Sequence, residues 1–264
     1  MASEQNRKMV ALITGASSGI GKEFARLHAK RGGDLVVVAR SEQKLSQLAA
    51  ELMREQACRV TVIAKDLTQA SAPKEVYDAV KAAGIEIDYL VNNAGFGGRG
   101  AFHERRWGDD LSMINLNVVA LTALTRFFLP DFVTRNHGRI LNVSSTAGLM
   151  PGPLQAVYYA TKAYVTSFSN AVAEELRGTA VTVTALMPGA TETEFARVAG
   201  MDKTPLFAKT ASAADVAWAG YEAMLQGRMD VIAGVTFGQR IMLAVVPFTP
   251  KKLLIRQIHE MQKA

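Results

Sequence analysis

Three tyrosines and one lysine stand together in the stretch VYYATKAYV, residues 157–165. A phenol beside an ammonium group can be a proton donor, or it can be a packed aromatic residue with a solvated neighbour. A free tyrosine has a pKa near ~10, which a neighbouring ammonium group lowers because it stabilises the phenolate. On a helix Tyr158 and Tyr159 both lie about one turn from Lys162, whereas Tyr164 lies on another face. The spacing therefore predicts a tyrosine–lysine pair for proton transfer, without choosing between Tyr158 and Tyr159.

The elements that would position this pair alternate along the whole chain. Short apolar runs predict strands over 9–14, 34–39, 59–64, 89–94, 139–144, 181–187 and 230–234. Amphipathic stretches predict helices over 20–32, 41–56 (with Ser41 as N-cap), 109–128, 155–177 and 211–226. The strands are apolar on both faces, as expected of a parallel sheet covered on two sides. We therefore expect an α/β fold, a doubly wound parallel seven-stranded sheet with helices on both faces (a Rossmann fold), in one NAD(P)-binding domain over residues 1–264.

A glycine-rich turn follows the first predicted strand. In LITGASSGIGKEF, residues 12–24, Gly15, Gly19 and Gly21 open the first predicted helix. Glycine permits a tight turn and close approach to a pyrophosphate, and the helix N-terminus presents free N–H groups to the anion. A glycine trio alone is often only a turn, but its place between strand and helix favours a dinucleotide site.

The end of the second predicted strand indicates which dinucleotide. An acidic residue here would accept hydrogen bonds from both ribose hydroxyls and repel a 2′-phosphate. The chain instead has Ala39 followed by Arg40. A guanidinium pairs bidentately with phosphate, so NADP(H) is favoured over NAD(H). The alternative is an arginine that only contacts solvent.

Several separate motifs occur in an order that resembles the short-chain dehydrogenase/reductase (SDR) family, in its classical single-domain type. They are TGASSGIG (14–21), KDLT (65–68), NNAG (92–95), NVVA (117–120), NVSSTAG (142–148), YYATK (158–162) and MPGATET (187–193). Each motif alone is weak, but the ordered set is specific and spans about residues 9–195.

The resemblance implies a catalytic set of Asn117, Ser145, Tyr158 and Lys162. The family pattern Y-x-x-x-K selects Tyr158, and the thirteen residues from Ser145 to Tyr158 fit the family spacing. Ser145 would donate a hydrogen bond to the carbonyl oxygen, and Tyr158 would be the general acid/base. Lys162 would lower the pKa of Tyr158 and bind the nicotinamide ribose. Asn117 would hold a water that links Lys162 to solvent.

The cofactor-binding residues implied by the resemblance follow the carboxyl ends of the predicted strands, where open α/β sheets bind ligands. They are Gly15, Ser17, Ser18, Gly19, Ile20, Gly21, Arg40, Asp66, Leu67, Asn92, Ala94, Gly95, Tyr158, Lys162, Pro188, Gly189, Thr191 and Thr193. Asp66 would bind the adenine, Asn92 would flank the ribose, and the residues after Pro188 would hold the carboxamide. Asx residues also end strands as turn formers, which is a purely structural alternative for Asp66 and Asn92.

Composition and charge argue against several other classes of protein. The formal charge is +6, but the basic residues are scattered and no aromatic-interleaved basic stripe indicates nucleic-acid binding. Cys58 is the only cysteine and the four histidines lack metal-ligand spacing, so we expect no disulfide and no metal. The polar N-terminus shows no secretory signal, and no apolar run reaches the ~20 residues of a membrane helix. We expect a cytoplasmic protein.

Together the motifs predict an NADP(H)-dependent oxidoreductase that interconverts a ketone or aldehyde and an alcohol. The alternatives are a dedicated 3-oxoacyl or steroid reductase and a non-catalytic protein that senses NADP(H). The complete catalytic set argues against a sensor, because binding alone needs neither the serine nor a proton relay. The resemblance implies a homodimer or homotetramer.

Substrate specificity is expected in segments 96–102, 149–155 and 193–209, the last as a mobile lid. Apolar residues predominate there over polar ones, which favours an apolar or medium-sized carbonyl compound. The apolar candidates are Phe96, Leu149, Met150, Phe195 and Phe207, and the polar ones are Arg99, Glu194 and Arg197.

The C-terminal residues 241–264 match the family least. Pro247 and Pro250 interrupt an apolar run, and a helix is then predicted with Leu254, Ile258 and Met261 on one face. Three placements remain open: packing on its own subunit, covering a partner's active site, or peripheral contact with a membrane surface.

Overall fold

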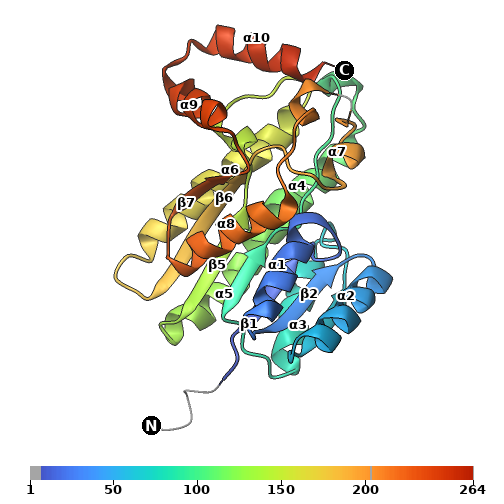
Figure 1. Ribbon diagram of the computed structural model, residues 1–264, viewed down its shortest axis with the longest axis vertical. Coiled ribbons are helices and arrows are strands. Elements are labelled where there is room, and N and C mark those ends of the chain that lie inside the picture. The colour runs from blue at the N-terminus through green and yellow to red at the C-terminus, as the bar shows by residue number, and fades with distance from the viewer. Residues whose placement is uncertain (1–6, 203, 264) are drawn as a thin grey trace.

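The computed structural model describes residues 7–202 and 204–263. One all-parallel sheet runs through it in the order β3-β2-β1-β4-β5-β6-β7 (Figure 1). The strands are β1 (Val10–Thr14), β2 (Asp34–Ala39), β3 (Val60–Ala64), β4 (Tyr89–Asn92), β5 (Gly138–Val143), β6 (Val181–Pro188) and β7 (Asp230–Ala233). This confirms the predicted fold class, and each predicted strand ends within two residues of its observed bounds. The order reverses between β1 and β4, the switch point at which doubly wound sheets bind nucleotides.

Helices cover both faces of the sheet (Figure 1). One apolar core lies under α1 (Gly19–Lys30), α2 (Glu42–Glu55) and α8 (Ala213–Leu225). The other lies under α3 (Ala72–Ala82), α5 (Leu121–Thr134) and α6 (Ala156–Glu175). Successive residues of a strand enter different cores: Ala11 and Ile13 belong to the first, and Leu12 to the second. This double burial is the reason that the strands are apolar on both faces.

The helix predicted over 109–128 is part of a longer one. It comprises α4 (Trp107–Ile114), a π-helical segment (Asn115–Ala120) and α5, 28 residues in all. By length and composition this helix could cross a membrane, but the core helix of a globular protein satisfies the same criteria. Met113, Phe128 and Phe132 are fully or almost fully buried within the protein, so we interpret it as a core helix.

Three α-helices among the described residues were not predicted: α3, α7 (Phe195–Val198) and α9 (Phe237–Val245). Helix α3 begins with Pro73 in its first turn, a position that favours proline because the missing N–H has no helical partner there. Helix α9 begins at Thr236, whose side chain and that of Gln239 form a reciprocal capping box. The T-x-x-Q pattern was the available sequence signal for α9.

The C-terminal helix α10 (Lys251–Gln262) packs on its own chain, at one end of the molecule with α9 (Figure 1). Its buried residues are Leu254, Ile258 and Gln262. Met261 lines the same cavity as Leu254 and Ile258 but is 38% exposed, whereas Gln262, which was not assigned to this face, is fully buried. The spacing of four residues between the three buried positions brings Gln262 over Leu254 and Ile258.

Candidate active site

A cavity of about 710 Å³ lies at the carboxyl ends of the strands. Its lining includes the glycine loop after β1, the ends of β2, β5 and β6, one face of α6 and the C-terminal helices. A cavity of this size is large enough for a cofactor or drug-sized ligand. The residues that could do chemistry and those that could bind a dinucleotide thus face the same space.

The glycine loop has the geometry that a pyrophosphate requires. Gly15 and Gly19 have φ angles of +68° and +54°, a left-handed conformation that favours glycine. A Cβ atom on Gly15 would lie 2.8 Å from Asn93 Nδ2, and one on Gly21 would collide with the carbonyl of Gly15. The N-cap residue of α1, Ser18, makes no side-chain capping bond and the first turn has no acidic residue. The first N–H groups of α1 are therefore free to bind an anion, as the dinucleotide interpretation requires.

Most of the cofactor residues implied by the resemblance line this cavity. They are Gly15, Ser17, Ser18, Gly19, Ile20, Arg40, Asp66, Leu67, Ala94, Gly95, Tyr158, Lys162, Pro188, Gly189, Thr191 and Thr193. Gly21 and Asn92 are not among the described lining residues. Gly21 is buried against Gly15. Asn92 is buried beneath α5, where its Nδ2 donates to Thr125 Oγ1 at 3.1 Å and to Asn142 Oδ1 at 2.9 Å, and Asn93 lines the cavity in its place.

The end of β2 presents positive charge to the cavity. Arg40 is exposed there, and Ser41 caps α2 by accepting a hydrogen bond from the Lys44 backbone N–H at 3.3 Å, as predicted. The ammonium of Lys44 lies 3.4 Å from a carboxylate oxygen of Glu194. Asp66 Oδ1 accepts from both the N–H and the hydroxyl of Thr68, which fixes its carboxylate at the end of β3.

Tyr158 and Ser145 face each other across the cavity end of α6. Tyr158 is 8% exposed and its phenol lies near the side chain of Ser145, which follows β5 and whose Oγ donates to the carbonyl of Pro188 at 3.5 Å. Ser145 Oγ also accepts from the backbone N–H of Ala147 at 3.1 Å. Burial raises the pKa of Tyr158 to about 12, and the nearby Ser145 side chain opposes this only in part. In the protein without cofactor the phenol is therefore protonated at neutral pH.

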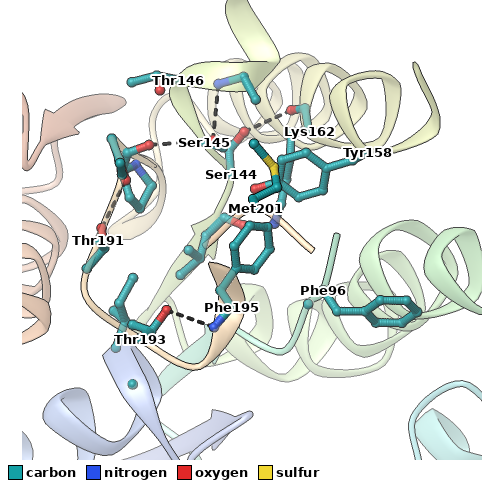
Figure 2. A pocket seen from close by; sticks show the side chains of 18 of the residues that line it. Phe96, Ser144, Ser145, Thr146, Tyr158, Lys162, Thr191, Thr193, Phe195 and Met201 are labelled. Carbon is teal, nitrogen blue, oxygen red and sulfur yellow. Dashed lines mark hydrogen bonds between the residues drawn. The ribbon is translucent and has the colours of Figure 1, made fainter. Parts of the chain in front are cut away.

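Lys162 is buried beside Tyr158 (Figure 2). Its Nζ donates to the carbonyl of Val143 at 2.8 Å and lies 5.9 Å from the centroid of the Tyr158 ring. Burial lowers the pKa of Lys162 to about 8, close to neutral pH. Perturbed pKa values of neighbouring groups in a cavity are typical of functional sites.

Asn117 lies behind this pair, in the π-helical segment. Its Nδ2 donates to the carbonyl of Phe96 at 3.0 Å and to Thr161 Oγ1 at 3.1 Å, and its Oδ1 accepts from the Phe96 N–H at 3.2 Å. It is 1% exposed and is not one of the described cavity-lining residues. The side chain therefore joins the loop after β4 to α6, one residue before Lys162. A π-helical turn inside an α-helix is common at functional sites.

The other two tyrosines make different contacts. The hydroxyl of Tyr159 accepts a hydrogen bond from Gln262 Nε2 at 2.8 Å. The hydroxyl of Tyr164 lies 3.0 Å from Thr122 Oγ1, and its ring stacks on Phe168. Of these three tyrosines, Tyr158 is thus the one whose phenol lies near Ser145 in the cavity.

The substrate side of the cavity contains residues that were predicted and others that were missed. Phe96, Met150, Glu194, Phe195 and Phe207 line it, and the Phe195 ring centroid lies 5.3 Å from that of Tyr158 (Figure 2). Arg99, Leu149 and Arg197 do not appear in the lining formed by the described residues. The missed lining residues come from the start of α6, the segment after β6 and the C-terminal segment, and include Gln155, Tyr159, Met201, Met242, Leu243, Val245, Val246, Leu254, Ile258 and Gln262.

Comparison with curated proteins gives two kinds of relative. The very-long-chain 3-oxoacyl-CoA reductase of Homo sapiens is 35% identical over 198 residues, which are 71% of this chain and 61% of the relative. The chain thus matches about three fifths of that protein's length. The NADP-dependent 3-hydroxy acid dehydrogenase YdfG of Escherichia coli (strain K12) is 37% identical over 192 residues, which are 72% of this chain and 76% of the relative.

Solved structures resemble the chain over almost its whole length. A short-chain dehydrogenase from Sphingobium yanoikuyae in complex with NADPH is 32% identical, with a TM-score of 0.82 and coverage of 97% of this chain and 98% of the other. One from Burkholderia phymatum in complex with NAD is 25% identical, with a TM-score of 0.80 and coverage of 97% of both chains. The family model for short chain dehydrogenases matches residues 9–203. The chain therefore belongs to the short-chain dehydrogenase family.

Proposed function

We propose that this protein is an NADP(H)-dependent oxidoreductase that interconverts a ketone or aldehyde and the corresponding alcohol. The observation that carries the proposal is that Ser145, Tyr158 and Lys162 line the same cavity as the glycine loop. Lys162 and Tyr158 are both buried. Burial of an ammonium group or of a phenol costs free energy. Buried titratable groups of this kind are typical of functional sites. A protein that only bound the dinucleotide would not need a serine near the buried phenol.

Each residue has a chemical task in this proposal. A nicotinamide cofactor supplies or accepts hydride when bound. Ser145 donates a hydrogen bond to the carbonyl oxygen, and Tyr158 gives its proton to the alkoxide that develops there. Protonated Lys162 stabilises the phenolate that remains and binds ribose hydroxyls. Asn117 accepts a hydrogen bond from a water linked to Lys162, because both of its side-chain N–H donors are used within the protein.

The preference for NADP(H) follows from the end of β2. Arg40 stands where an acidic residue would otherwise bind the ribose, and it lines the cavity. A 2′-phosphate would pair with this guanidinium, whereas NAD(H) would leave it without an anionic partner. The NADPH complex of the Sphingobium protein and the name of the Escherichia coli relative support this preference. Because the Burkholderia protein binds NAD, both cofactors are to be measured.

A dedicated 3-oxoacyl reductase is the second candidate. It is supported by the name of the 35% identical relative, a very-long-chain 3-oxoacyl-CoA reductase. The apolar lining, which includes Phe195, Phe207 and Met150, is compatible with an acyl chain as well as with a bulky ketone. The two candidates share the same chemistry at Tyr158 and differ only in the group attached to the carbonyl carbon.

The test is oxidation of NADPH and NADH by the purified protein with aldehydes, ketones and 3-oxoacyl thioesters. We expect turnover that is faster with NADPH than with NADH, and the best substrate identifies its class. Tight NADPH binding in a fluorescence titration, without turnover on any of these substrates, would contradict the proposal and favour a non-catalytic binding protein.

A further inference from the structure

The segment from α9 to the end of α10, residues 237–262 (the tail), forms one side of the active-site cavity. Its buried apolar residues all line that cavity: Leu243, Val246, Leu254 and Ile258. The last three belong to the same buried cluster as Tyr158 and Tyr159. The tail is therefore an apolar wall next to the proposed proton donor.

Gln262 holds the end of this wall through two hydrogen bonds. Its Nε2 donates to the hydroxyl of Tyr159 at 2.8 Å, and its backbone carbonyl accepts from Arg99 Nε at 2.7 Å. Gln262 is fully buried, although it is one of the last residues that the structure describes. We call Tyr159, Gln262 and Arg99 the tail anchor. It joins α10 to α6 and to the loop after β4.

The tail anchor lies next to Tyr158, the proposed proton donor, but takes no part in the proton transfer. The rings of Tyr158 and Tyr159 lie edge to face with centroids 6.1 Å apart. The Tyr158 phenol lies near the Ser145 side chain, whereas the hydroxyl of Tyr159 is bonded to Gln262. Loss of the tail anchor would therefore alter the wall of the cavity and leave Tyr158 and Ser145 in place.

We propose that the tail anchor positions the tail as the specificity-determining wall of the active site, and that the tail selects carbonyl compounds with a bulky apolar group. This inference rests on the proposed carbonyl reduction at Tyr158. A bulky apolar group is bound more tightly when it also removes the apolar surface of the tail from water. A small aldehyde reaches Ser145 and Tyr158 without that contact. Tyr159, Gln262 and Arg99 are thus positioning residues.

Two variants and two matched controls test this inference. Tyr159→Phe removes the hydroxyl and keeps the ring, and Gln262→Ala removes the amide. Tyr164→Phe removes another hydroxyl of α6, one bonded to Thr122 at 3.0 Å instead of to the tail. Lys263→Ala changes an exposed residue next to Gln262 that pairs with Glu260. Each variant is assayed with 4-acetylbiphenyl as the bulky ketone and with propanal as the small substrate.

We expect Tyr159→Phe and Gln262→Ala to raise the KM for 4-acetylbiphenyl by roughly tenfold or more, the effect of losing apolar contact in a binding pocket. The kcat/KM for propanal should stay within about twofold of the unmodified protein, because Ser145 and Tyr158 keep their positions. The two control variants should match the unmodified protein with both substrates. A parallel loss with both substrates, or no change in the bulky-ketone KM, would overturn the inference.

Hydrogen exchange of residues 251–262 provides a readout that does not depend on turnover. We expect faster exchange of this segment in Tyr159→Phe than in Tyr164→Phe, and slower exchange in the unmodified protein when 4-acetylbiphenyl and NADPH are added. If the unmodified protein reduces no carbonyl compound, the proposed function fails, and this exchange pattern still decides whether the tail is anchored and contacts a bulky ligand. Equal exchange in the two variants, or no protection by the ketone, would overturn the inference.

Discussion

The ammonium of Lys162 is bonded to the carbonyl of Val143, 2.8 Å away, and not to the hydroxyl of Tyr158. The sequence predicts that Lys162 lowers the pKa of Tyr158, whereas burial raises that pKa to about 12 in the protein without cofactor. Burial also lowers the pKa of Lys162, to about 8, because it disfavours the charged ammonium. In the protein without cofactor, the surroundings of the two groups therefore do not favour ionisation of the Tyr158 phenol. In the proposed reaction the phenolate forms only when a carbonyl oxygen and the charge of the cofactor are beside it.

The lowered pKa of Lys162 predicts a pH dependence of stability. Between pH 8 and pH 10.5 the unfolded chain keeps the Lys162 proton and the folded protein releases it. The free energy of unfolding should therefore rise with pH in this window, by at most ~1.4 kcal/mol per pH unit from this group. Tyr158, whose folded pKa is raised from 10, contributes with the opposite sign only above pH 10.

The comparison that isolates this effect is with Lys162→Met. Urea unfolding of both proteins at pH 8 and pH 9.5 should show the unmodified protein gaining stability relative to Lys162→Met. An equal change with pH in both proteins would mean that the buried Lys162 does not titrate in this range.

Ser145→Ala should lower kcat by roughly a hundredfold to a thousandfold, the usual effect of removing one donor to a developing oxyanion. The affinity for NADPH should be unchanged, because the loss falls on the substrate oxygen. Steady-state kinetics with the best carbonyl substrate and a fluorescence titration with NADPH measure the two quantities. An increase in KM at constant kcat would assign Ser145 to ground-state binding instead.

Arg40→Ala should weaken NADPH binding by roughly tenfold or more and leave NADH binding unchanged, because a charge-assisted hydrogen bond to a phosphate is lost. Arg54→Ala is the matched control, since Arg54 is an exposed arginine on α2 that pairs with Glu55. The dissociation constants of NADPH and NADH, measured for both variants and the unmodified protein, test this prediction. Equal weakening of NADPH and NADH would place Arg40 outside the 2′-phosphate site.

The sheet could be predicted from the sequence because a strand buried on both faces leaves a continuous apolar run, as β1 and β2 do. Ser145, Tyr158 and Lys162 could be assigned because their spacing is tied to one strand end and one helix. Asn92 and Asn93 were harder to distinguish. They are neighbours at the end of β4, and the alternation of side chains turns Asn92 beneath α5 and leaves Asn93 at the cavity.

Gln262 had no comparable signal. A glutamine near the end of a polar segment is usually solvated, and Met261 completes an apolar face with Leu254 and Ile258 equally well on a helical wheel. Gln262 is buried because Tyr159 and Arg99 offer it hydrogen-bond partners, and these residues are 103 and 163 positions away. Contacts between such distant positions cannot be read from local periodicity.

The central claim is that Tyr158 is the proton donor, and single-turnover oxidation of bound NADPH tests it most directly. With saturating substrate, Tyr158→Phe should lower the rate by roughly a hundredfold to ten-thousandfold, while NADPH binds with unchanged affinity. Tyr159→Phe should keep the rate with propanal. A Tyr158→Phe protein that oxidises NADPH as fast as the unmodified protein would contradict the proposed mechanism and require another acid in the cavity.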